Sequence, residues 1–105
     1  MKKAGAEDAP LHPKIAPDTL RPYDRKNWPK LFENYPEEII HGRMMELRKQ
    51  AALIAANDRR CDVVYAADHS NLRSIPPDGI EVFADCENGF RVRIDMRGNI
   101  MRGVK

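Results

Sequence analysis

The sequence predicts an α+β fold in which one long amphipathic helix packs on a three- to four-stranded antiparallel sheet. Two patterns carry this prediction: an apolar stripe at helical spacing over residues 36–57, and two alternating segments, 80–86 and 90–97, on either side of a short turn. The chain has 105 residues, 42% of them hydrophobic, which suits one domain with one core. We expect an extended Pro-rich arm over residues 1–22, followed by a single domain over residues 23–105.

Proline distinguishes the arm from the rest of the chain. Six of the eight prolines lie within residues 1–36, and each removes a backbone donor and favours extended geometry in the residue before it. Trp28, Phe32 and Tyr35 follow at a spacing that suits one or two helical turns. Two interpretations are open. We favour packing of the arm on its own domain, because a small domain needs its aromatic residues for its core; the alternative is an arm that binds a partner, with Trp28 as an anchor.

The long helix is predicted from about residue 36 to residue 57. Its apolar positions step by four, three, four and three residues, at Ile40, Met44, Leu47, Ala51 and Ile54. This spacing places them on one face of a helix. A coiled coil would show the same spacing, but three heptads are short, so packing on a sheet is the expected arrangement.

The first strand is predicted over residues 61–67, which are rich in β-branched and aromatic side chains. Residues 68–78 have the composition of a loop that closes with a Pro-Pro-Asp-Gly turn. Cys61 and Cys86 both fall on predicted strands, where we expect small, buried, free cysteines. Two cysteines are too few for a disulfide scaffold, and the N-terminal residues lack the apolar stretch of a secretory signal, so the prediction is a cytoplasmic protein. No run of 18 apolar residues exists, so no membrane association is expected.

The turn between the alternating segments decides which side chains share a face. A two-residue turn at Asn88 and Gly89 would set apolar residues opposite carboxylates, whereas a three-residue loop that begins at Glu87 sets apolar residues opposite apolar residues. The longer loop also puts Gly89 at a left-handed position, which favours glycine. We therefore predict the three-residue loop. The cross-strand pairs expected on the outer face are Asp85 with Arg91, Phe83 with Arg93, and Glu81 with Asp95.

A second tight turn is predicted at Gly98 and Asn99, followed by a strand over residues 100–103 that brings Arg102 near Asp95. Arginines then gather on the outer face of the sheet. Three of them alternate along one strand, one comes from the next strand, and an aromatic ring lies among them: Arg91, Arg93, Arg97, Arg102 and Phe83. Guanidinium groups of this kind bind carboxylates and phosphates.

These residues predict a small non-enzymatic interaction module, such as an inhibitor, an immunity-type protein or an accessory protein. The arginine-bearing face would bind an acidic surface of a partner protein, and a homodimer is also compatible with the sequence. The net charge of +2 is too small for a dedicated, non-specific nucleic-acid binder. The other interpretation of the arginines is a charged face that keeps the sheet soluble.

A small metal-independent ribonuclease-type toxin, or an RNA-binding protein, is the alternative function. Its catalytic candidates are Glu81, Asp95, Arg93 and His69, which would supply acid, base and phosphate-binding groups. This alternative rests on fold-level analogy. Neither the spacing of Cys and His residues nor any Gly-rich phosphate-binding motif indicates a bound group, so no metal and no cofactor are predicted.

Overall fold

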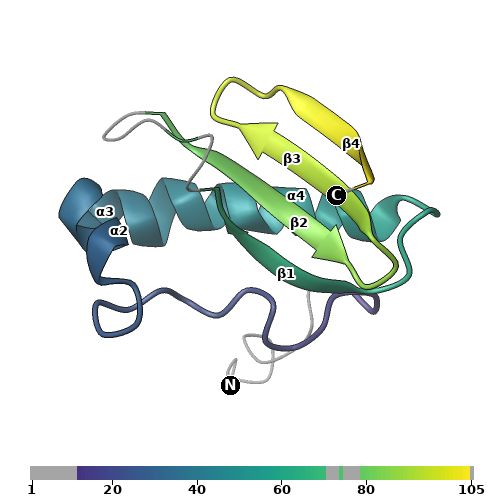
Figure 1. Ribbon diagram of the computed structural model, residues 1–105, viewed down its shortest axis with the longest axis horizontal. Helices are drawn as coiled ribbons and strands as arrows, with labels where there is room; N and C mark the ends of the chain where they lie inside the picture. Colours follow the sequence, from purple (N-terminus) through teal and green to yellow (C-terminus); the bar gives the residue numbers. More distant parts are fainter. Residues whose placement is uncertain (1–11, 71–73, 75–78, 105) are drawn as a thin grey trace, which may run out of the picture.

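The computed structural model of the chain describes residues 12–70, 74 and 79–104. One long helix packs against a four-stranded antiparallel sheet, and the predicted α+β class is confirmed (Figure 1). The helical elements are α2 (Pro29–Asn34), α3 (Glu37–Ile39), the π-helical turn η1 (Ile40–Met44) and α4 (Met45–Asn57). The strands are β1 (Val64–His69), β2 (Glu81–Cys86), β3 (Phe90–Asp95) and β4 (Ile100–Val104).

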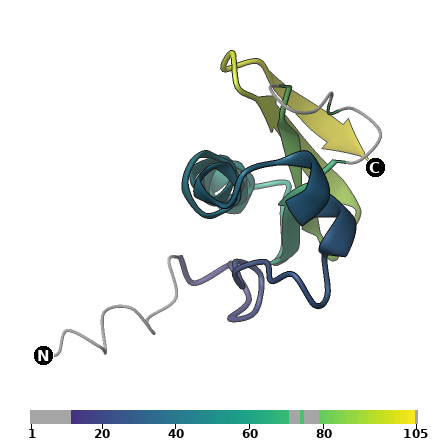
Figure 2. The ribbon, with the colours of Figure 1, turned by 90° about the vertical axis from the view of Figure 1, so that its left-hand side faces the viewer.

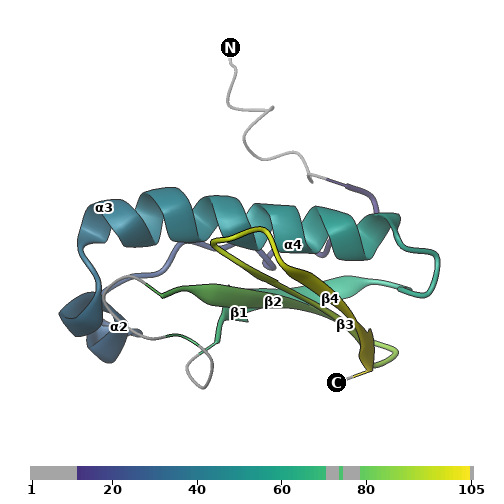
Figure 3. The same cartoon turned by 90° about the horizontal axis from the view of Figure 1, so that it is seen from above.

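The long helix consists of α3, η1 and α4, which follow one another without a break from Glu37 to Asn57. It lies on one face of the sheet, whose strand order is β1-β2-β3-β4 (Figures 2 and 3). The helix packs against the first three strands. Within the described residues, no helix has both the length and the apolar character needed to cross a membrane.

The core lies between α4 and the sheet. Leu47 and Ala51 of the helix and Val82 and Val92 of the sheet belong to one cluster of buried apolar side chains. The apolar residues of the helical pattern and those of the alternating pattern therefore both lie in this layer.

Truncation of Leu47, whose side chain is 3% exposed, tests this packing. We expect Leu47→Ala to lower the free energy of unfolding by about 2–5 kcal/mol, because the substitution removes buried methyl groups and leaves a cavity. Gln50→Ala, at an exposed position of the same helix, should stay within about 0.5 kcal/mol of the wild type. Urea denaturation measures both, and equal midpoints for the two variants would contradict the packing.

The predicted hairpin of β2 and β3 is confirmed in loop length and in register. Ala84 pairs with Val92, and Gly89 has a φ of 96°, in the left-handed region. The expected outer pairs are all present: Asp85 with Arg91, Phe83 with Arg93, and Glu81 with Asp95.

The second turn spans residues 96–98, whereas a two-residue turn at Gly98 and Asn99 was predicted. Gly98 has a φ of 87° and donates its N–H to the Asp95 carbonyl at 3.1 Å, so the loop has the same three-residue form as the first. β4 consequently pairs Arg102 with Val92. The predicted turn would set Arg102 opposite Asp95, so the two registers differ by three residues, and a shift by an odd number of residues moves every side chain of a strand to the other face. The prediction that Arg102 lies near Asp95 on the outer face is therefore wrong, since Arg102 is on the helix side of the sheet.

The prediction of two free cysteines is also wrong, because Cys61 and Cys86 form a disulfide. β1 begins at Val64, three residues later than predicted, and Val64 pairs with Cys86 at the end of β2. The loop that enters β1 passes beside this end of β2, and the Cα atoms of the two cysteines are 5.6 Å apart. The number of cysteines in the sequence could not reveal that these two are close together. The pairing of β1 with β2 brings them together.

The described part of the arm runs beside β1 (Figure 1). Ile15 forms a parallel bridge with Val64; the Val64 N–H donates to the Lys14 carbonyl at 2.7 Å, and the Ala16 N–H donates to the Val64 carbonyl at 2.9 Å. Further along β1, the Ala67 carbonyl accepts a hydrogen bond from the Arg48 side chain. The chain thus covers this edge of its own sheet. Residues 1–11 of the predicted arm and the Pro-Pro-Asp part of the predicted 76–79 turn lie outside the described residues.

Candidate functional site

β4 is the last strand of the sheet, and among the described residues it pairs only with β3. At the start of the hairpin, the Asp95 N–H donates to the Asn99 carbonyl at 3.2 Å, so Asn99 directs its backbone groups toward β3. Because this direction alternates along an antiparallel strand, Met101 and Gly103 also direct their backbone groups toward β3. The other backbone groups of the strand point away from β3, and they belong to Ile100, Arg102 and Val104. No described residue bonds to these groups. We call this side of the strand the β4 edge.

Apolar side chains are exposed along the β4 edge. The exposed fractions are 44% for Ile100, 46% for Met101 and 84% for Val104. Ile100 and Val104 lie on the helix side of the sheet together with Arg102, whereas Met101 lies on the outer face opposite Arg93. An edge strand with exposed apolar side chains is a template for pairing with a further strand.

The outer face offers fewer free arginines than the sequence predicts. Arg91 lies opposite Asp85, and the distance from its Nη2 to Oδ2 of Asp85 is 2.8 Å. Its guanidinium also lies 4.3 Å from the centre of the Phe83 ring, although the cross-strand partner of Phe83 is Arg93. The hydrogen bonds to Asp85 raise the pKa of Arg91. Arg91 is therefore held within the sheet surface by its neighbours.

The four predicted arginines do not share one face. Arg97 lies in the turn before β4 rather than on β3, and Arg102 is on the helix side. Arg93 does project from the outer face, and its side chain makes no hydrogen bond or ion pair within the described part of the chain. The available guanidinium groups thus surround the β4 edge from both faces of the sheet.

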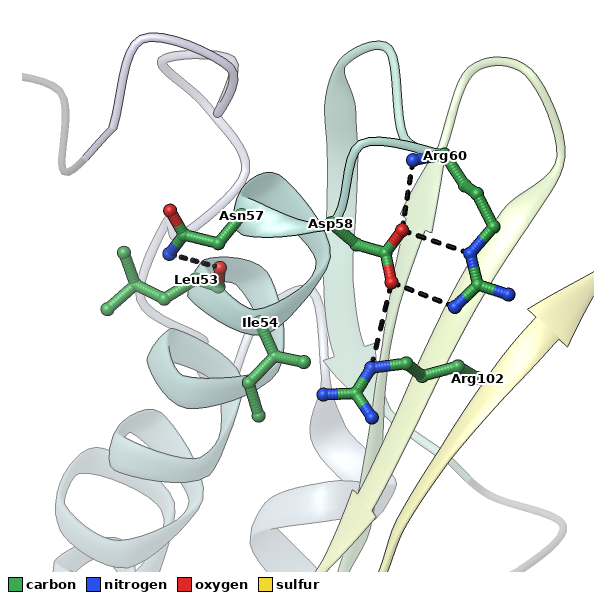
Figure 4. A pocket seen from close by; sticks show the side chains of 6 residues that line it. All are labelled: Leu53, Ile54, Asn57, Asp58, Arg60 and Arg102. Atoms are coloured by element: carbon green, nitrogen blue, oxygen red, sulfur yellow. Dashed lines mark hydrogen bonds and ion pairs between the residues drawn. The ribbon is translucent and has the colours of Figure 1, made fainter.

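A pocket of about 470 Å³ opens beside β4, at the carboxyl end of α4 (Figure 4). It is lined by Leu53, Ile54, Asn57, Asp58, Arg60 and Arg102. One side of the pocket is apolar, and the other carries two guanidinium groups around one carboxylate (Figure 4). Sequence reasoning missed this site because Arg102 was assigned to the opposite face.

Asp58 organises the charged side of the pocket. Its carboxylate accepts two hydrogen bonds from the Arg60 side chain, at 3.0 and 2.9 Å, and one from the Arg60 N–H at 2.9 Å. These bonds hold the pKa of Asp58 well below its usual range. The Arg60 guanidinium also lies 4.7 Å from the centre of the Phe90 ring. Arg102 is held more loosely, since its Nε is 3.7 Å from Oδ2 of Asp58.

The candidate ribonuclease residues are not brought together as a set. Glu81 and Asp95 are cross-strand neighbours, as predicted. Asp95, however, accepts hydrogen bonds from the Asn99 side chain and from two backbone N–H groups in its turn, and these lower its pKa. His69 is buried at the end of β1 rather than in a loop, on the face opposite that of Arg93.

His69 belongs to a polar cluster that joins the arm to β1 and α4. The Tyr23 hydroxyl donates to Oδ1 of Asp68 at 2.8 Å and accepts the His69 N–H at 3.0 Å. Nε of Arg48 donates to the Ala67 carbonyl at 2.6 Å, and the Arg48 guanidinium stacks 4.1 Å from the centre of the Tyr23 ring. Burial raises the pKa of Tyr23 and lowers that of Arg48. These contacts indicate a structural role for the cluster.

Trp28, the predicted aromatic anchor, packs on the Tyr23 ring at a centroid distance of 4.3 Å. It is half-buried against the core and belongs to the arm beside β1 rather than to the surface around β4. Among the residues that the structure describes, no three His, Cys, Asp or Glu side chains are grouped so that they could hold a metal ion. Comparison of the chain with protein-family models, with curated proteins and with solved structures gave no match.

Proposed function

We propose that this chain is a small protein-interaction module that binds an extended, acidic segment of a partner protein along the β4 edge. The segment would add a fifth strand to the sheet, in the manner of β-strand addition. Main-chain hydrogen bonds to the outward groups of β4 would supply much of the affinity, and Arg93 and Arg102 would select for acidic side chains.

The observation that carries the proposal is the contrast between the two edges of the sheet. The arm and Arg48 cover the backbone groups of β1, whereas no described residue covers those of β4. Proteins normally protect such an edge with prolines, bulges, charges or a covering segment. β4 instead has a regular register with β3 and exposes Ile100, Met101 and Val104.

Charge favours an acidic partner over a second copy of this chain. β4 contains one arginine and no carboxylate, and Arg93 and Arg97 lie near it. Two β4 strands paired with each other would bring like charges together, which destabilises a pair of strands. An acidic segment would instead be complementary to the arginines on both faces.

A labelled peptide that alternates valine with glutamate is a suitable probe, with fluorescence anisotropy as the measurement. Ile100→Pro removes an outward N–H without breaking the pairing with β3, and Ile100→Thr keeps that N–H while it also loses apolar surface. We expect Ile100→Pro to bind the peptide roughly five- to tenfold more weakly than Ile100→Thr, since a net hydrogen bond is worth up to about 1.5 kcal/mol.

Three outcomes would contradict the proposal. Equal affinities of the two Ile100 variants would show that the β4 edge is not used. Tighter binding of a valine–lysine peptide would contradict the charge preference. Binding of a single-stranded RNA that Ile100→Pro leaves unchanged, with no binding of the acidic peptide, would favour the RNA-binding alternative.

The cellular compartment is a separate part of the proposal. The prediction of a cytoplasmic protein depended in part on two free cysteines, and Cys61 and Cys86 are bonded to each other instead. Structural disulfides persist mainly in oxidising compartments. The disulfide therefore supports a place of action in such a compartment over the cytoplasm.

A further inference from the structure

We infer that the pocket between the carboxyl end of α4 and β4 receives a carboxylate side chain of the bound segment, with Arg102 as the residue that binds it. This inference rests on the proposed function and adds a position at which the partner must be acidic. It also assigns different roles to the two arginines that line the pocket.

Arg102 has the free donors. Arg60 directs Nε and Nη2 at the Asp58 carboxylate and stacks on the Phe90 ring, so its orientation is fixed from two sides. The closest contact of Arg102 with Asp58 is from Nε, at 3.7 Å, which is longer than a hydrogen bond, and the two Nη atoms point away from Asp58 (Figure 4). Its two Nη groups are left to form a bidentate pair with an incoming carboxylate.

Asp58 and Arg60 act as positioning residues. Oδ2 of Asp58 lies between the two guanidinium groups, which limits the repulsion between them and orients Arg102 at the mouth of the pocket (Figure 4). The pocket then carries two positive charges and one negative charge, an excess that attracts one carboxylate. The side chain of Arg102 is 45% exposed and is therefore accessible from solvent.

The place of Arg102 on β4 connects the pocket to strand addition. Its backbone groups point outward, and its side chain lies on the helix side of the sheet. A residue of an added strand directly opposite Arg102 would project its side chain to the same side. The next residue on that side, two positions along the segment, would lie near the apolar lining formed by Leu53 and Ile54. The expected pattern in the partner is therefore an acidic residue and an apolar residue two positions apart.

Two matched peptides and two matched variants test this assignment. The peptides alternate valine with either glutamate or glutamine, and the variants are Arg102→Gln and Arg21→Gln, which remove the same charge. Arg21 is exposed on the arm beside β1 and controls for the loss of net charge. We expect Arg102→Gln to weaken binding of the glutamate peptide about tenfold, and to leave binding of the glutamine peptide within about twofold. Arg21→Gln should change neither by more than about twofold.

Methyl NMR signals of Leu53 and Ile54 give an independent measurement, because they should shift when the glutamate peptide binds. The inference is overturned if the peptide binds in an Ile100→Pro-sensitive manner but Arg102→Gln and Arg21→Gln behave alike, or if these methyl signals do not move. A complete absence of peptide binding by the wild-type protein would instead overturn the proposed function itself. The two failures are thus distinguishable.

Discussion

Replacement of Arg48 with methionine should lower the free energy of unfolding by about 3–5 kcal/mol, because removal of one member of a buried charged network leaves its partners without compensation. The Arg48 side chain is 2% exposed. It donates to the carbonyls of Ala67 and Thr19 and stacks on the Tyr23 ring. Methionine fills much of the same volume, so the loss reports on the polar contacts rather than on a cavity.

Arg43→Met is the matched control for this substitution. Arg43 lies on the exposed side of the same helix, and its Nη1 is 4.0 Å from the Glu46 carboxylate. Exposed pairs of this kind contribute about 0–1 kcal/mol. Urea unfolding of the two variants should therefore separate them clearly. Similar midpoints would mean that Arg48 does not join the arm to the core.

Reduction of the disulfide should lower the free energy of unfolding by about 3 kcal/mol, the effect expected for a crosslink that closes a loop of this size. Cys61 and Cys86 are separated by 25 residues, and the bond joins the loop after α4 to the end of β2. Urea denaturation of the wild-type protein with and without dithiothreitol measures the change.

A double variant, Cys61→Ala with Cys86→Ala, controls for other effects of the reductant. Its midpoint should not respond to dithiothreitol. Mass spectrometry of the wild-type protein should show a loss of 2 hydrogen masses in the oxidised form, as a disulfide requires. An unchanged wild-type midpoint after complete reduction would contradict a stabilising crosslink.

The fold could be predicted because local patterns in the sequence agree with one another. The apolar stripe that includes Leu47 and the alternation of Val82 and Ala84 both require a buried face, and Gly89 suits the left-handed position of the longer hairpin loop. Burial of one face penalises a register shifted by one residue, because the shift would expose the apolar side chains. The pairing of β2 with β3 therefore followed from the sequence.

The second hairpin was mispredicted because β4 buries little apolar surface in either the predicted or the observed register. Ile100, Met101 and Val104 are exposed on the two faces of β4, so hydrophobic matching gives no signal there. The register then depends on the placement of Gly98 in the turn alone, and a three-residue difference in register moved Arg102 from the outer face to the pocket. The weak patterning that misled the prediction is also what leaves the β4 edge open to a partner.

Contacts between distant segments could not be predicted from spacing. Tyr23 bonds to Asp68 because the segment that follows the arm lies against β1, and Cys61 bonds to Cys86 because β1 pairs with β2. The same arrangement places His69 in the core, where sequence composition had indicated a loop. These are tertiary effects that override local propensity.

Amide hydrogen exchange along β4 tests the central claim most directly, because it reports on each backbone N–H separately. In the free protein, the N–H groups of Met101 and Gly103 should be protected by β3, whereas those of Ile100 and Arg102 should exchange rapidly. Addition of the valine–glutamate peptide should protect Ile100 and Arg102. Slow exchange at these two residues in the free monomer, or binding of the peptide with no added protection there, would show that β4 does not accept a further strand.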